Sequence, residues 1–111
     1  MKVSDIVEKL NLEIFSGSKG LDREIHGGYT SDLLSDVMGH AESGDVWTTL
    51  QTHKNVIAIA SLKELAAVII VKGLKPEADT IAQSNEEGIP ILGTSKETFE
   101  IAGQLYNLIK G

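Results

Sequence analysis

Residues 46–71, VWTTLQTHKNVIAIASLKELAAVIIV, decide the fold. Two apolar runs rich in strand-forming residues, 46–50 and 66–71, stand at the ends of this stretch. The intervening residues 55–65 mix β-branched side chains, which favour a strand, with Ala, Leu, Lys and Glu, which favour a helix. Length and the right-handed crossover rule favour the helix. The stretch therefore predicts a β-α-β unit, which joins two parallel strands.

Apolar periodicity predicts the remaining elements on both sides of this unit. Helices are predicted at residues 3–10, 32–42, 77–87 and 97–109, and strands at 12–15, 24–29 and 89–92. Pro90 lacks a ladder donor, so the strand at 89–92 is expected at or near a sheet edge. The glycine-rich residues 16–20 lack P-loop spacing and are interpreted as a flexible turn. Consecutive crossovers predict a small three-layer α/β domain with a short, mainly parallel sheet.

Side-chain patterns also predict how two helices meet the core. In the helix after Pro76, the side chains of Ala78, Ile81 and Ala82 form a modest inward stripe. The last helix is expected to begin with a capping box of Thr94 and Glu97. Its inward face is expected to consist of Phe99, Ala102, Leu105, Tyr106 and Ile109.

Composition excludes several classes of protein. The 111 residues suit one domain, residues 1–111, and contain no cysteine, which excludes disulfides and thiolate metal sites. The formal net charge is −6 and Arg23 is the only arginine, which argues against nucleic-acid binding. No apolar run approaches the roughly 20 residues needed to span a bilayer, and no apolar signal core follows Met1. A cytoplasmic protein that does not bind membranes is therefore expected.

The second half of the chain carries a family resemblance. Residues 67–76, AVIIVKGLKP, residues 86–95, EEGIPILGTS, and Thr98 follow one another as an ordered set of strand, loop and helix signals. This set resembles the N-terminal domain of bacterial HPr kinase/phosphorylase and, most closely, the related DRTGG domains. Residues 28–37, GYTSDLLSDV, and 44–47, GDVW, look like stand-alone DRTGG domains, and more weakly like the N-terminal domain of Mur ligases.

The resemblance covers roughly residues 25–108 and implies a fold like that of the HPr kinase N-terminal domain. The literal string DRTGG is absent, because Asp22-Arg23 and Gly27-Gly28 are spaced differently, so no residue role follows from that name. In HPr kinase the P-loop and the catalytic machinery belong to the C-terminal domain, to which nothing in this chain corresponds. The resemblance therefore implies a regulatory or assembly module.

The usual catalytic and metal-binding patterns are absent. His26, His40 and His53 lie on three separate predicted segments, without the spacing of a metal-ligand pair. There is no G-x-S-x-G nucleophile elbow and no P-loop. No catalytic residue, metal site or cofactor is therefore predicted.

Polar residues gather where the predicted parallel strands end. Free amides at the following helix starts favour an anion there, and Lys54, Lys72 and Lys75 would add positive charge. The alternative is that the hydroxyl and amide side chains cap helices and need no ligand. The candidate ligand-binding residues are Thr52, His53, Lys54, Asn55, Gly73, Thr94 and Ser95.

Two classes of function stay open. The first is a non-catalytic regulatory or ligand-sensing module that self-associates, most simply as a homodimer, and binds a small anionic ligand or a protein partner. An open sheet edge favours the dimer, with Trp47 and the strand at 24–29 expected at the contact. The second is a small enzyme that acts on a phosphorylated metabolite at the same loops. Only His53 is placed to transfer a proton, so the binding module is favoured.

Overall fold

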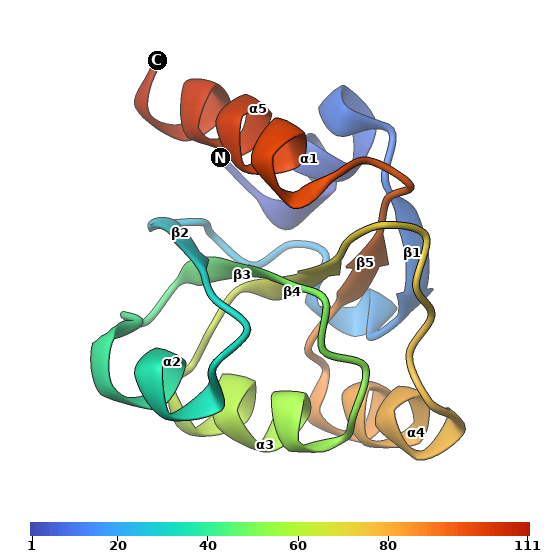
Figure 1. Cartoon of the computed structure of the whole chain (residues 1–111). Coiled ribbons are helices and arrows are strands. Elements are labelled where there is room, and N and C mark those ends of the chain that lie inside the picture. The colour runs from blue at the N-terminus through green and yellow to red at the C-terminus, as the bar shows by residue number, and fades with distance from the viewer.

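The computed structural model describes residues 1–111 as one sheet with helices on both faces (Figure 1). The α-helices are α1 (Val3–Leu10), α2 (Leu34–His40), α3 (Asn55–Leu62), α4 (Ala78–Glu87) and α5 (Thr98–Lys110). The strands are β1 (Glu13–Ser16), β2 (Gly27–Thr30), β3 (Asp45–Thr49), β4 (Ala67–Ile70) and β5 (Ile91–Gly93), and a 3-10 turn, η1, covers Ser18–Gly20.

The sheet has the order β1-β5-β4-β3-β2 and is mainly parallel. β2, β3, β4 and β5 pair in parallel, whereas β1 pairs antiparallel with β5. Helices α1 and α5 cover one face, and α2, α3 and α4 cover the other (Figure 1). The decisive stretch forms β3-α3-β4 with its two strands parallel and Val46 opposite Ala67. The predicted three-layer α/β fold is therefore confirmed.

Two apolar clusters fill the space between the sheet and its two helical layers. Side chains alternate along β3, so that Val46 belongs to the α1/α5 side and Trp47 to the α2/α3 side. Trp47 is fully buried, and its Nε1–H donates to the Ser31 carbonyl oxygen at 2.8 Å. The prediction that Trp47 contributes to a contact with a second copy is therefore wrong, because its side chain belongs to the core.

In two helices the buried face differs from the predicted one, wholly in α4 and partly in α5. In α4 the buried side chains are Thr80 and Ser84. Their hydroxyl groups face inward because they donate hydrogen bonds to backbone carbonyl oxygens, Thr80 to that of Thr52 (2.9 Å) and Ser84 to that of Ile89 (2.6 Å). Ala78 and Ala82, from the predicted stripe, are exposed.

In α5 Leu105 is buried as predicted and Ile109 packs partly buried against the same cluster, but Ile101 is buried with them, and Phe99 and Tyr106 are 92% and 65% exposed. Apolar residues occur at helical spacing on two neighbouring faces of α5, so periodicity alone did not distinguish the inward face. The predicted capping box is also absent. Glu97 precedes the first turn without a side-chain cap.

Local hydrogen bonds explain the remaining differences at element ends. α2 begins at Leu34 and not at residue 32, because the Asp32 carboxylate accepts hydrogen bonds from Thr49 Oγ1 and the Leu50 amide, both at 2.9 Å. β5 lies next to the edge strand β1, and Pro90 just precedes it, where its carbonyl accepts from the Val68 amide at 3.0 Å. The sequence pattern predicted neither the hydrogen bonds of Asp32 nor that of the Pro90 carbonyl.

Candidate ligand-binding site

The seven candidate residues follow the carboxyl ends of β3, β4 and β5. The chain leaves β3 and β4 toward the face that carries α3 and α4, but leaves β5 toward the opposite face, where α5 lies (Figure 1). The loops therefore start at the same end of the sheet and then diverge. The seven residues divide into two groups as a result.

The first group, Gly73, Thr94 and Ser95, lines a cleft of about 340 Å³. Two backbone bonds join the loops that form it: the Gly73 amide donates to the Thr94 carbonyl oxygen at 2.9 Å, and the Lys72 amide donates to the Lys96 carbonyl oxygen at 3.0 Å. The cleft is completed by Leu10, Asn11, Glu13, Phe15, Leu74, Lys75, Gly93 and Lys96. The two strand-end loops thus form one wall of the cleft, and the chain from the end of α1 through β1 forms the other.

The backbone of the β4–α4 loop adopts a demanding conformation beside this cleft. Lys72 and Gly73 are both in the left-handed region, at φ 61° and 71°. For a side chain other than glycine this costs about 1–2 kcal/mol, and such strain persists only where the surroundings impose it. Here the two backbone hydrogen bonds to the β5–α5 loop impose the left-handed conformation.

Two lysines give the cleft positive charge. Lys75 Nζ lies 5.3 Å from the centre of the Phe15 ring, and Lys96 Nζ donates to Gln104 Oε1 at 2.8 Å. Neither ammonium group forms an ion pair, whereas Lys72 Nζ lies 3.9 Å from Glu97 Oε1. An anion that enters the cleft therefore meets two ammonium groups without an ion-pair partner, while the Glu13 carboxylate belongs to the opposite wall.

The second group, residues 52–55, lies apart from this cleft. The Thr52 carbonyl accepts from the Glu77 amide (3.2 Å) and Thr80 Oγ1 (2.9 Å), and His53 Nδ1 accepts from the Asn55 amide (3.2 Å). Lys54 and Asn55 line a separate hollow of about 220 Å³ with Ala58 and Gln83. The structure does not bring this group into one cavity with Thr94 and Ser95.

Helix capping does not account for the candidate set, because neither α3 nor α5 has a side-chain cap. His53 Nδ1 accepts a hydrogen bond from the Asn55 amide beside the start of α3. Thr94 does not cap α5, which begins four residues later; its Oγ1 accepts from the Lys96 amide at 3.2 Å within the loop. Participation of any of the seven residues in ligand binding stays a prediction.

Sequence reasoning missed the wall of the cleft that β1 supplies, including Glu13 and Phe15. β1 was predicted as a strand, but its partner was not, because an antiparallel strand added at the sheet edge leaves no crossover pattern in the sequence. The pairing of Glu13 with Gly93 brings this wall to the carboxyl end of β5.

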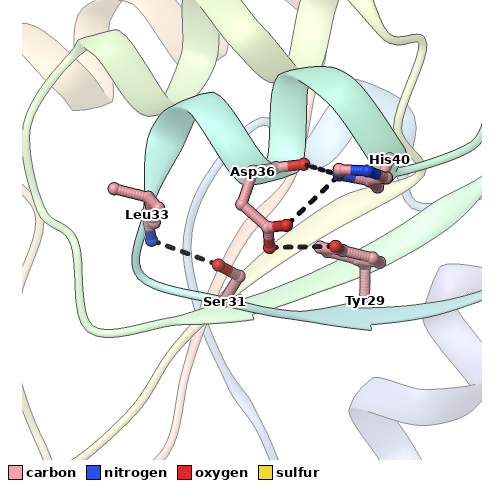
Figure 2. A network of polar contacts seen from close by, with 5 residues as sticks. All are labelled: Tyr29, Ser31, Leu33, Asp36 and His40. Atoms are coloured by element: carbon pink, nitrogen blue, oxygen red, sulfur yellow. Dashed lines mark hydrogen bonds and ion pairs between the residues drawn. The ribbon is translucent and has the colours of Figure 1, made fainter.

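A polar network stands at the other edge of the sheet, where β2 leads into α2 (Figure 2). Tyr29 Oη donates to Asp36 Oδ2 at 2.9 Å, the Leu33 amide donates to Ser31 Oγ at 3.1 Å, and His40 Nδ1 lies 3.2 Å from Asp36 Oδ1. The hydrogen bond from Tyr29 is the largest cause that lowers the pKa of Asp36, and a hydrogen bond from Ser31 is the second. The hydrogen bond between Tyr29 and Asp36 also raises the pKa of Tyr29. The network holds α2 against β2.

Asp36 should make the stability of the protein depend on acid pH. Because its pKa is lowered in the folded state, its contribution is present above the unfolded pKa of about 3.9 and is lost as the pH falls through the folded pKa. The difference in unfolding free energy between the wild type and Asp36→Asn should therefore shrink below about pH 4.

Tyr29→Phe provides the control for this prediction, because it removes the largest cause of the shift. Carboxyl resonances followed by NMR titration should show the pKa of Asp36 rising toward its ordinary value in this variant. An Asp36 pKa that is the same in both proteins would contradict the assigned cause.

The described chain contains no group of three His, Asp or Glu side chains arranged to hold a metal ion. No helix combines the length and the apolar character that crossing a membrane requires.

Two bacterial proteins are similar to the whole of this chain. HPr kinase/phosphorylase of Bacillus cereus (strain G9842) is 25% identical over 130 residues, and that of Bacillus mycoides (strain KBAB4) is 24% identical. Each match includes the whole of this chain but 41% of the relative, so the chain spans about two fifths of the length of these relatives.

A solved structure shares the fold. It contains the CBS and DRTGG domains of the regulatory region of Clostridium perfringens pyrophosphatase, complexed with the activator diadenosine tetraphosphate. The TM-score is 0.72 at 14% identity, over 95% of this chain and 45% of that one. The model of the DRTGG domain family matches residues 5–108. The chain belongs to the DRTGG domain family.

Proposed function

We propose that this chain is a non-catalytic regulatory domain that binds a small anionic ligand in the cleft between residues 73–75 and 93–96. The observation that carries the proposal is the pair of lysines in the cleft, Lys75 and Lys96, whose ammonium groups have no carboxylate partner. The regulatory region of the pyrophosphatase, which contains a DRTGG domain, is complexed with a phosphate-rich activator. This supports a phosphorylated ligand for this chain.

Backbone groups strengthen the case for an anion. The amides of Lys75 and Ser95 make no hydrogen bond within the protein, and both residues line the cleft. Amides and hydroxyls directed at one space, together with nearby ammonium groups, are the groups that bind phosphate in proteins without arginine. Because the whole chain carries a net charge of −6, this local cluster must overcome a general repulsion. The two lysines lie in the cleft itself, so their attraction is the larger effect there, and binding should weaken as salt screens them.

The name of the curated relatives does not decide the activity of this chain, since it spans only 41% of them. The structure offers no nucleophile with an adjacent base in the cleft, where the titratable side chains are Glu13, Lys75 and Lys96. This census favours binding over catalysis on a phosphorylated metabolite.

The test is ligand-dependent thermal stabilisation across a panel of sugar phosphates, nucleotides and inorganic tripolyphosphate. A specific binder present at 100 times its Kd raises the unfolding free energy by about 2.7 kcal/mol. Lys75→Gln should weaken binding by about 1.5–3 kcal/mol, because a hydrogen bond to a charged group is lost.

Lys54→Gln is the matched control, since Lys54 lies in the separate hollow beside Gln83. An unchanged affinity in Lys54→Gln assigns binding to the cleft alone, whereas a loss extends the site to residues 52–55. A panel without any stabilising compound would contradict the proposal.

We also propose that the domain self-associates as a homodimer through the open edge of β2. Gly27–Thr30 has a strand partner on one side only, and Tyr106 and Ile109 of α5 line a small groove beside it with Gly28 and Thr30. An unpaired edge next to exposed apolar side chains is a surface that a second copy can cover. Light scattering should give twice the 11.9 kDa mass of the chain. A monomer mass at all concentrations would contradict this.

A further inference from the structure

Phe15 occupies an unusual position in the sheet. In the pairing of β1 with β5, Ile14 lies opposite Leu92 and Ser16 lies opposite Ile91, so Phe15 is the extra residue of a β-bulge. Bulges redirect side chains and are frequent beside functional sites. Here the Phe15 ring packs partly buried against the apolar cluster on the α2/α3 side and also lines the cleft.

The residue opposite the ring gives it room. A Cβ atom added at Gly93 would overlap the ring and lie 2.7 Å from its Cζ, so only glycine allows the ring to lie against the β5 backbone. The Lys75 ammonium lies over the Phe15 ring, 5.3 Å from the ring centre, and covers it. Lys75 belongs to a loop and is exposed, so this cover is easily moved.

We propose that the Phe15 ring is a stacking platform for a nucleobase, so that the ligand of the cleft is a nucleotide. This inference rests on the proposed ligand-binding function of the same cleft. A base is flat, aromatic and able to stack on a phenyl ring, whereas the phosphates of a nucleotide are not.

The cleft lining contains both kinds of side chain that a nucleotide needs. Leu10, Phe15 and Leu74 give the cleft an apolar part, and the strand-end loops with Ser95 and Lys96 give it a polar part. The volume of about 340 Å³ falls at the lower end of the range of small-molecule sites, about 300–1,000 Å³. When a base takes the place above the ring, the Lys75 ammonium is released toward the phosphates.

Calorimetric titration of the whole chain with ATP, GTP, CTP and UTP, compared with inorganic tripolyphosphate, tests the inference. At least one nucleoside triphosphate should bind on the order of 10- to 100-fold more tightly than tripolyphosphate, which carries the phosphates without a base. Phe15→Leu should abolish this advantage, so that this variant binds nucleoside triphosphate and tripolyphosphate with equal affinity. Phe15→Tyr, which keeps a stacking face, should retain it.

The outcomes separate the two proposals. Equal affinities for tripolyphosphate and all four nucleotides would overturn the nucleobase platform and leave the anion site standing. No binding by any of these five probes would also overturn the platform, and the anion site falls with it when the sugar phosphates of the thermal panel fail as well. An NMR measurement on the wild type makes the test independent of the folding of the variants. Nucleotide should shift the Phe15 ring resonances by its ring current, and tripolyphosphate should not. Unshifted ring resonances in the presence of bound nucleotide would also overturn the inference.

Discussion

Gly17→Ala should lower the free energy of unfolding by about 2–5 kcal/mol, from left-handed strain and overpacking together. Gly17 has φ 73°, and a Cβ atom there would overlap the Ile89 carbonyl and lie 2.7 Å from Pro90 Cα. Both obstacles are backbone, which cannot rotate away as a side chain can. The Gly17 amide also donates to Asn85 Oδ1 at 2.8 Å, which holds the loop against the end of α4. Urea unfolding measures the loss.

Gly73→Ala is the matched control for this prediction. Gly73 has nearly the same conformation, φ 71°, but a Cβ atom added there meets nothing within 4 Å. It should lose only the cost of left-handed strain, about 1–2 kcal/mol. Equal losses in the two variants would mean that residues 16–20 move aside, as the flexible turn predicted from the sequence would do.

The glycine loop shows why sequence patterns predicted the elements better than their contacts. Glycine spacing indicates that a turn is present, but a free turn and a turn packed against another backbone have the same sequence pattern. Gly17 is packed because β1 lies antiparallel beside β5, and that pairing joins residues far apart in the chain. The β3-α3-β4 unit was predictable because its strands, helix and parallel pairing follow from one continuous stretch.

The candidate site was predictable to a similar extent. Parallel strands end at one side of the sheet, and this rule brought Gly73 and Thr94 into the correct neighbourhood. It did not specify that α5 crosses to the opposite face from α3, which separates Lys54 from Ser95. Phe15 was beyond the rule because a bulge, which no pattern in residues 12–15 indicates, determines its direction.

Ser84→Ala should destabilise the protein by about 2–4 kcal/mol, because it leaves two buried polar groups without partners. Ser84 Oγ donates to the Ile89 carbonyl oxygen at 2.6 Å and accepts from Ser16 Oγ at 2.9 Å. Both serine side chains are buried, so water does not replace the lost bonds. This hydroxyl pair joins β1, α4 and the chain before β5, the same region that Gly17 packs against.

Ser16→Ala distinguishes the loss of the pair from the loss of the carbonyl bond. In this variant Ser84 keeps its bond to Ile89 and loses only an incoming donor, so the cost should be about 0.5–1.5 kcal/mol. In the double variant no Ser16 hydroxyl remains to be left without a partner, so the total cost should be smaller than the sum of the two single costs. Urea unfolding of the four proteins measures this coupling. Additive costs would show that the two hydroxyls act independently, and the stability of this corner would then depend on the Ile89 carbonyl bond alone.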